Sequence, residues 1–185
     1  MASDHTILVL GDSLSAALGI RPEQGWVALL AQRLQAQGYG YQIVNASVSG
    51  ETTSGGLERL PRALQLHQPG TVILELGAND GLRGLPVETT RANLDQIIEM
   101  LQSEGSKVVL AGMTLPPNYG PDYIKPFQQV YVDLAAKYKV TRIPFLLSDV
   151  ALHAELMQRD GIHPTAQGNE IVAKTVMHYL KPLLH

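Results

Sequence analysis

The chain has 185 residues, of which 45% are hydrophobic and 17% charged, and its formal net charge is −3. These values are typical of one globular domain, so we expect a single domain over residues 1–185, and the lack of a basic stretch speaks against a nucleic-acid-binding protein. The chain has no cysteine, which excludes disulfides, thiolate nucleophiles and cysteine metal sites.

Strands and helices are predicted to alternate along the chain. The apolar run Thr6–Leu10 predicts a buried strand, which Gly11 ends with a turn. Further strands are expected at Tyr41–Ala46, Thr71–Leu76, Lys107–Ala111 and Val140–Phe145. The spacing of apolar residues predicts helices at Trp26–Gln37, Leu57–His67, from Thr89 or Thr90 to about Ser103, at Tyr123–Tyr138 and at Thr165–Leu180.

Two prolines refine these predictions. Because proline is tolerated only near the first turn of a helix, Pro61 indicates that the second helix begins late or is kinked. Pro144, near the end of the last predicted strand, suits an edge of the sheet. The alternation as a whole predicts an α/β fold with a mostly parallel sheet between two layers of helices.

Polar clusters follow three successive predicted strands, at residues 11–15, 45–53 and 77–81. The carboxyl ends of parallel strands meet at one edge of a sheet, where such folds bind their ligands. Ser13 lies just past the first strand, and we interpret it as a nucleophile. A serine hydroxyl needs a neighbouring base to attack a carbonyl near neutral pH.

His163 is the candidate base. The other five histidines lie near the termini, at helix ends or, for His153, in a polar stretch expected to be helical, and we interpret them as surface residues. His163 stands in the turn Asp160–Pro164, where the Asp160 carboxylate can reach one imidazole nitrogen while the other faces Ser13. The spacing alone leaves an alternative open, in which Asp160 only caps local backbone amides.

Donors for a developing oxyanion are also available. The Gly50 backbone N–H, the Asn79 side-chain amide and the Ser13 backbone N–H are candidates for this role. Gly50 and Asn79 are each also explained by an ordinary turn. Their common place after strands at the edge that carries Ser13 favours the catalytic interpretation.

Four short blocks together resemble the SGNH, or GDSL, hydrolase family. They are Gly11–Ser15, Gly50 within residues 49–52, Gly77–Asp80 and Asp160–His163, in the family's order, and the chain is most similar to the bacterial thioesterase I, protease I and lysophospholipase group. The resemblance implies a five-stranded flavodoxin-like sheet, esterase, arylesterase, thioesterase or lysophospholipase activity, and a periplasmic location.

The same resemblance implies roles for single residues. Ser13 would be the nucleophile, His163 the base and Asp160 the residue that orients it, with Ser13, Gly50 and Asn79 forming the oxyanion hole. The expected partner is a small-molecule acyl ester or thioester, without a cofactor, metal ion or nucleic acid. No apolar run is long enough to span a bilayer, so no stable membrane insertion is expected, and a monomer is expected.

An acyl chain needs an apolar groove beside Ser13. We expect the loops at residues 77–86 and 113–123 to flank it, and the spacing of glycine and proline in the first loop indicates that it moves on ligand binding. The candidate lining residues are Leu82, Leu85, Leu115, Pro116, Tyr119 and Ile162.

Other functions remain to be weighed. A flavodoxin-like module that binds an anion at the same strand ends would leave Asp160 and His163 without a role. A carbohydrate acetyl-ester hydrolase would share the chemistry of the leading hypothesis. The nucleophile elbow of α/β-hydrolases, Gly-x-Ser-x-Gly, does not match because Ser15 occupies its last position, and the metalloprotease motif His-Glu-x-x-His is absent.

Overall fold

A parallel sheet of five strands forms the centre of the computed structural model, which describes residues 3–185. The strands run in the order β2-β1-β3-β4-β5, and every neighbouring pair is parallel. Their bounds are Ser3–Gly11 for β1, Gln42–Asn45 for β2, Pro69–Glu75 for β3, Lys107–Ala111 for β4 and Thr141–Ile143 for β5. This order is the flavodoxin-like one and confirms the predicted fold class.

The central position of β1 explains its apolar sequence. Val9 pairs with Asn45 on one side and with Ile73 on the other, so β1 has hydrogen-bonded neighbours at both edges. Ile7, Leu8, Val9 and Leu10 are fully buried, as is typical of a strand covered by helices on both faces. The short β5 lies at the edge of the sheet, as Pro144 indicates.

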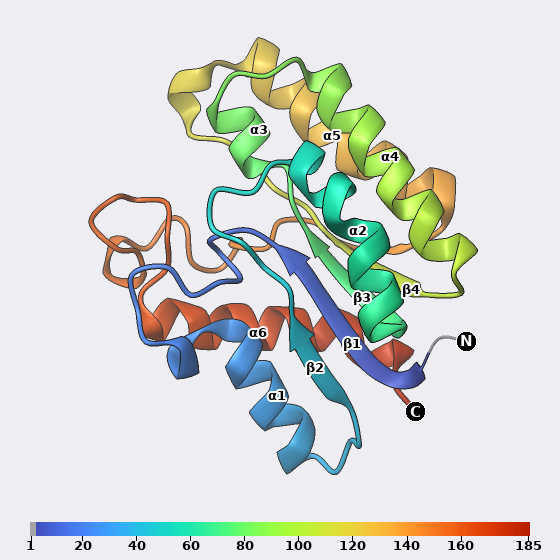
Figure 1. The fold of residues 1–185 in the computed structure, drawn as a ribbon. Helices are drawn as coiled ribbons and strands as arrows, with labels where there is room; N and C mark the ends of the chain where they lie inside the picture. Colours follow the sequence, from blue (N-terminus) through green and yellow to red (C-terminus); the bar gives the residue numbers. More distant parts are fainter. Residues whose placement is uncertain (1–2) are drawn as a thin grey trace.

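Two layers of helices enclose the sheet (Figure 1). Helices α1 and α6 pack together on one face, while α2, α4 and α5 cover the other. The helix bounds are Trp26–Ala36 for α1, Thr53–His67 for α2, Ala78–Leu82 for α3, Val87–Ser103 for α4, Pro121–Tyr138 for α5 and Ala166–Leu180 for α6, with short 3-10 helices at Pro22–Gln24, Pro117–Tyr119, Ala154–Leu156 and Lys181–Leu183.

The expected late start of α2 is wrong. The helix begins at Thr53 because the Thr52 hydroxyl accepts a hydrogen bond from the Gly55 N–H and caps it. Pro61 stands inside the helix on its exposed side, where it removes one backbone donor. Burial of Leu60 and Leu64 on the opposite side holds the helix against the sheet.

Other differences lie near the ends of helices. Neither Thr89 nor Thr90 caps α4, which begins at Val87, and the Thr90 hydroxyl instead donates to the buried Asp80 carboxylate at 3.0 Å. Residues 78–82, expected in a loop, form α3. His153 precedes a 3-10 helix instead of lying in an α-helix, although its side chain is exposed as expected.

Candidate active site

The turn after β1 carries Ser13, and Asp12 organises this turn. The Ser15 and Ala16 N–H groups donate to the Asp12 carbonyl, and the Leu14 N–H donates to the Asp12 carboxylate at 3.0 Å. The half-buried Ser13 places its Oγ 2.7 Å from Nε2 of His163. The fold therefore brings together two residues that lie 150 positions apart in the chain.

Asp160 fixes His163 from the other side. Its Oδ2 lies 2.5 Å from His163 Nδ1, while its Oδ1 accepts the N–H groups of Ile162 at 2.9 Å and His163 at 3.0 Å. The alternative in which Asp160 only caps local amides is therefore wrong, because the same carboxylate caps these amides and also binds the imidazole.

Hydrogen bonding decides the charge of Asp160. Burial alone would raise its pKa, but the bonds from the His163 side chain and from the two backbone N–H groups outweigh this effect and lower the pKa to about 2. The carboxylate is therefore ionised at neutral pH, which favours a proton on Nδ1 and leaves Nε2 free to accept the Ser13 proton. Such a chain of groups can carry a proton away from a serine during nucleophilic attack.

The Asn79 amide binds the segments that carry the two other candidate oxyanion donors, Ser13 and Gly50. Its Nδ2 donates to the Glu51 carbonyl at 2.9 Å and lies 3.3 Å from Oδ2 of Asp12. Glu51 follows Gly50 and Asp12 precedes Ser13, so one side chain of α3 links both turns. The backbone N–H groups of Ser13 and Gly50 donate to no acceptor within residues 3–185.

The loop between β2 and α2 is held in place at several points. Arg59 donates to the Ala46 carbonyl and forms a 2.6 Å ion pair with Glu51, at the two ends of this loop. Arg83 donates to the Gly50 carbonyl at 3.0 Å. Gly50 has a φ of +81°, a conformation that glycine adopts most easily, and this explains its residue type.

An apolar cavity of about 490 Å³ opens beside these groups. Its lining includes Leu14, Ala78 and Ile162, which directly adjoin Ser13, Asn79 and His163 in the chain. Four of the expected lining residues are present there, namely Leu82, Leu115, Pro116 and Ile162.

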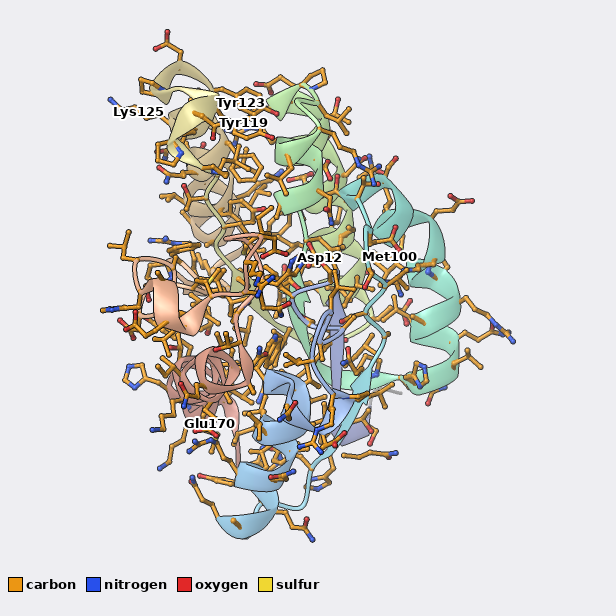
Figure 2. The ribbon with its side chains drawn as sticks, turned by 90° about the vertical axis from the view of Figure 1, so that its left-hand side faces the viewer. Asp12, Met100, Tyr119, Tyr123, Lys125 and Glu170 are labelled. Carbon is orange, nitrogen blue, oxygen red and sulfur yellow. The ribbon has the colours of Figure 1, made fainter. Side chains whose placement is uncertain are left out.

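Tyr119 and Leu85 do not line this cavity. Tyr119 instead donates its hydroxyl to the Leu82 carbonyl at 2.7 Å, and the neighbouring Tyr123 donates to the Leu85 carbonyl (Figure 2). The two stacked tyrosines therefore hold the backbone at the end of α3 and in the loop that follows it.

A further part of the cavity wall comes from the segment between β5 and the Asp160 turn, which sequence reasoning missed. Its lining residues are Phe145, Leu147, Ser148, Ala151, Leu152 and Met157. The only signal in the sequence is the apolar content of this segment. It has neither helical nor strand spacing, because most of it is irregular in the structure.

A buried acidic pair beneath the Ser13 turn was also missed. Oε1 of Glu75 accepts the Ser15 hydroxyl at 2.6 Å and the Asp12 N–H at 3.3 Å, and all three side chains are at most 2% exposed. A Cβ atom on Gly11 would lie 2.8 Å from Glu75 Oε1 and from Ser15 Oγ. Gly11 is thus required by this close approach and not, as expected, by the conformation of a sharp turn.

Within residues 3–185, no group of three His, Cys, Asp or Glu side chains is placed to hold a metal ion. No helix in this range combines the length and the apolar character needed to cross a bilayer.

The chain is similar to known proteins in both sequence and fold. The model of the GDSL-like Lipase/Acylhydrolase family matches residues 9–171. Esterase TesA of Pseudomonas aeruginosa is 49% identical over 183 residues, which are 99% of this chain and 91% of the relative. Thioesterase 1/protease 1/lysophospholipase L1 of Escherichia coli (strain K12) is 39% identical over 184 residues, 100% of this chain and 87% of the relative. A crystal structure of the psychrotrophic esterase EstA from Pseudoalteromonas sp., inhibited by monoethylphosphonate, is 38% identical with a TM-score of 0.92, covering 96% of this chain and 97% of that one.

Proposed function

The chain belongs to the GDSL-like lipase/acylhydrolase family, and on this premise we propose that it is a serine hydrolase that cleaves carboxylic esters and thioesters through an acyl-enzyme on Ser13. The observation that carries the proposal is the continuous contact from Ser13 through His163 to the ionised Asp160. The relatives named as an esterase and as a thioesterase/lysophospholipase support the substrate class.

Acylation begins when Ser13 Oγ attacks the carbonyl carbon of the substrate. His163 Nε2 takes the hydroxyl proton as the new C–O bond forms, and Asp160 stabilises the resulting imidazolium. The carbonyl π electrons move to the oxygen and give a tetrahedral intermediate. When this intermediate collapses, the bond to the alcohol or thiol breaks and His163 returns the proton to the leaving group.

The oxyanion of that intermediate binds to the N–H groups of Ser13, Gly50 and Asn79. The two backbone donors have no acceptor within residues 3–185. The second Asn79 N–H turns from its long 3.3 Å contact with Asp12 to the oxyanion, while its first remains on Glu51. The two backbone donors are in place before the reaction, which avoids the cost of reorganising them at the transition state.

Deacylation repeats these steps with water. His163 removes a proton from a water molecule that attacks the acyl carbonyl, and the collapse of the second intermediate releases the carboxylic acid and restores the Ser13 hydroxyl. All proton transfers use side chains of this chain, so the reaction needs no cofactor or metal ion.

The acyl chain of the substrate occupies the 490 Å³ cavity, which falls within the usual range for a small-molecule site. Its apolar lining favours aryl and alkyl esters, acyl-CoA and lysophospholipids over acetylated sugars. Substrate binding there involves Leu82, Leu115, Pro116 and Ile162. Tyr119 contributes indirectly, through its hydrogen bond to the Leu82 carbonyl.

A chain-length series tests the function. We expect p-nitrophenyl esters and acyl-CoA from C2 to C12 to be hydrolysed, with kcat/KM rising beyond acetate as the acyl chain fills the cavity. Ser13→Ala should abolish turnover of every member. Turnover that survives in Ser13→Ala would contradict the nucleophile, and a preference for acetylated sugars would favour the carbohydrate esterase.

The cellular setting is part of the proposal. The family likeness supports a periplasmic location, and the small-molecule substrate fits a single-domain monomer. Cell fractionation and light scattering of the purified protein test these statements. Recovery of the protein with the cytoplasmic fraction would refute the periplasmic location, and a stable dimer would refute the monomer.

A further inference from the structure

The buried pair of Asp12 and Glu75 is not used by the reaction as described above. Glu75 ends β3 in the sheet register opposite Gly11, and its side chain is fully buried. Asp12 is 1% exposed and lies at the centre of the molecule (Figure 2). One hydrogen bond joins the two residues, from the Asp12 backbone N–H to Oε1 of Glu75 at 3.3 Å. Burial and the nearness of the second acidic group disfavour two negative charges here, so one of the two carboxyl groups carries a proton.

The surrounding donors show which group holds that proton. Asp12 accepts the Leu14 N–H and the Asn79 amide, both of which favour its ionised form. Glu75 uses only Oε1 to accept hydrogen bonds, and within residues 3–185 no N–H or hydroxyl group donates to its buried Oε2. Oε2 is therefore the oxygen of Glu75 that bears the proton.

The electrostatic surroundings of the pair also favour a proton on Glu75. Burial raises the pKa of Glu75 well above its ordinary value, and the neighbouring Asp12 raises it further. The other titratable groups near the pair are Tyr131 of α5 and His163 of the Asp160 turn, and Asp80 of α3 lies near Tyr131. Of these, only His163 can supply positive charge, and its effect on the pair is exerted on Asp12.

We propose that Glu75 is a positioning residue for the oxyanion hole: it holds the Asp12 backbone and Ser15, so that Asp12 in turn fixes the Ser13 turn and the resting position of Asn79. The inference rests on the proposed function, because it assigns Glu75 a role in the same reaction. The route runs from the Ser15 hydroxyl through Glu75 and Asp12 to the Asn79 amide. Glu75 touches no reacting atom and acts only through these neighbours.

Two substitutions of Glu75 separate positioning from mere folding. Glu75→Gln is uncharged and keeps an acceptor oxygen for the Ser15 hydroxyl and the Asp12 N–H, so kcat should remain within about threefold of the wild-type value. Glu75→Leu loses this acceptor, and kcat should fall about tenfold to a hundredfold while KM changes little, because the cavity wall is intact. Wild-type kcat in folded Glu75→Leu, or equal losses in the two variants, would overturn the proposal.

A matched pair of serine variants covers the case in which Glu75→Leu does not fold. Ser15→Ala removes the 2.6 Å bond to Glu75, and Ser106→Ala removes a buried 2.7 Å bond to Pro69 far from the site. Both should lower Tm by about 2–4 °C. Only Ser15→Ala should lower kcat, by about threefold to tenfold; equal kcat in both variants would contradict the route through Glu75.

The proton on Glu75 has a signature of its own in equilibrium unfolding. Above the ordinary value of 4.5 the unfolded chain loses this proton while the folded protein keeps it, so the wild type loses stability as pH rises toward the raised pKa. The unfolding constant of wild type relative to Glu75→Gln should therefore rise about tenfold per pH unit in this window. The other nearby groups are common to both proteins. A ratio that does not change with pH would show that Glu75 is ionised.

These outcomes are separable from failure of the proposed function. If Ser13→Ala retains turnover, the function itself is wrong. If Ser13→Ala is inactive while Glu75→Leu and Ser15→Ala both match the wild type, only the role of Glu75 is refuted.

Discussion

The Asn79→Ala variant removes a side chain that links the Ser13 turn to the Gly50 loop. The methyl group that replaces the amide can donate neither to an oxyanion nor to its two present acceptors, the Glu51 carbonyl at 2.9 Å and Asp12 at 3.3 Å. Catalysis and stability are therefore both affected, but by different amounts that can be estimated separately.

The expected loss in stability is modest. The bond to Glu51 is a partly buried neutral bond, worth about 1 kcal/mol, and the long contact with Asp12 adds less, so the free energy of unfolding should fall by about 1–2 kcal/mol. Loss of one oxyanion donor typically lowers kcat by about 10²- to 10³-fold, equivalent to about 2.7–4 kcal/mol of transition-state stabilisation. The catalytic loss should therefore exceed the loss in stability.

Asn93→Ala is the matched control, since its amide donates to Thr53 at 3.1 Å from a partly buried position on α4 and contacts neither the Ser13 turn nor Gly50. We expect similar urea midpoints for the two variants, and a kcat near wild type for Asn93→Ala only, with p-nitrophenyl butyrate as substrate. Asn79→Ala with a kcat within threefold of Asn93→Ala would refute the assignment of Asn79 to the oxyanion hole.

Two further predictions concern the base and the cavity. Asp160→Asn should lower kcat about 10³- to 10⁴-fold at pH 7, because a neutral amide cannot stabilise the imidazolium, and a loss below tenfold would contradict the role of Asp160. With the pKa of Asp160 lowered to about 2, its ionised form stabilises the fold above the ordinary value of 3.8, and this contribution is lost as pH falls through about 2. The difference in urea stability between wild type and Asp160→Asn should accordingly shrink between pH 5 and pH 2; a constant difference would argue against a lowered pKa. Ile162→Ala removes about 1–2 kcal/mol of apolar contact and should lower kcat/KM about fivefold to thirtyfold for p-nitrophenyl octanoate but not for the acetate. Val132→Ala, at 39% exposure against 37% for Ile162, is its control on α5, and equal effects of both variants would exclude Ile162 from the acyl site.

The sequence was informative where local order decides the structure. Asp160 and His163 lie three residues apart, so their contact depends on one turn. The positions of Ser13, Gly50 and Asn79 after strands follow from the parallel sheet, whose alternating pattern is plain in the sequence. The contact between Ser13 and His163, in contrast, depends on the whole fold and could be expected only from the chemistry a serine requires.

Long-range packing explains what sequence reasoning missed. Glu75 lies within the predicted apolar strand Thr71–Leu76, and its partner Asp12 lies 63 positions away, so their contact depends on the register of β3 against β1. The wall segment at residues 145–157 follows the protein surface without a repeating pattern. At Pro61, a local rule failed because the Thr52 cap and the buried face of α2 outweigh the lost donor.

The most direct test of the account is the site of covalent modification by a fluorophosphonate. We predict that intact-mass measurement shows one phosphonyl adduct, that peptide mapping places it on Ser13, and that residual esterase activity falls in proportion to the labelled fraction. Ser13→Ala, with Asp160 and His163 still in place, should remain unlabelled. An adduct on another residue, or full ester turnover by completely labelled protein, would contradict Ser13 as the nucleophile.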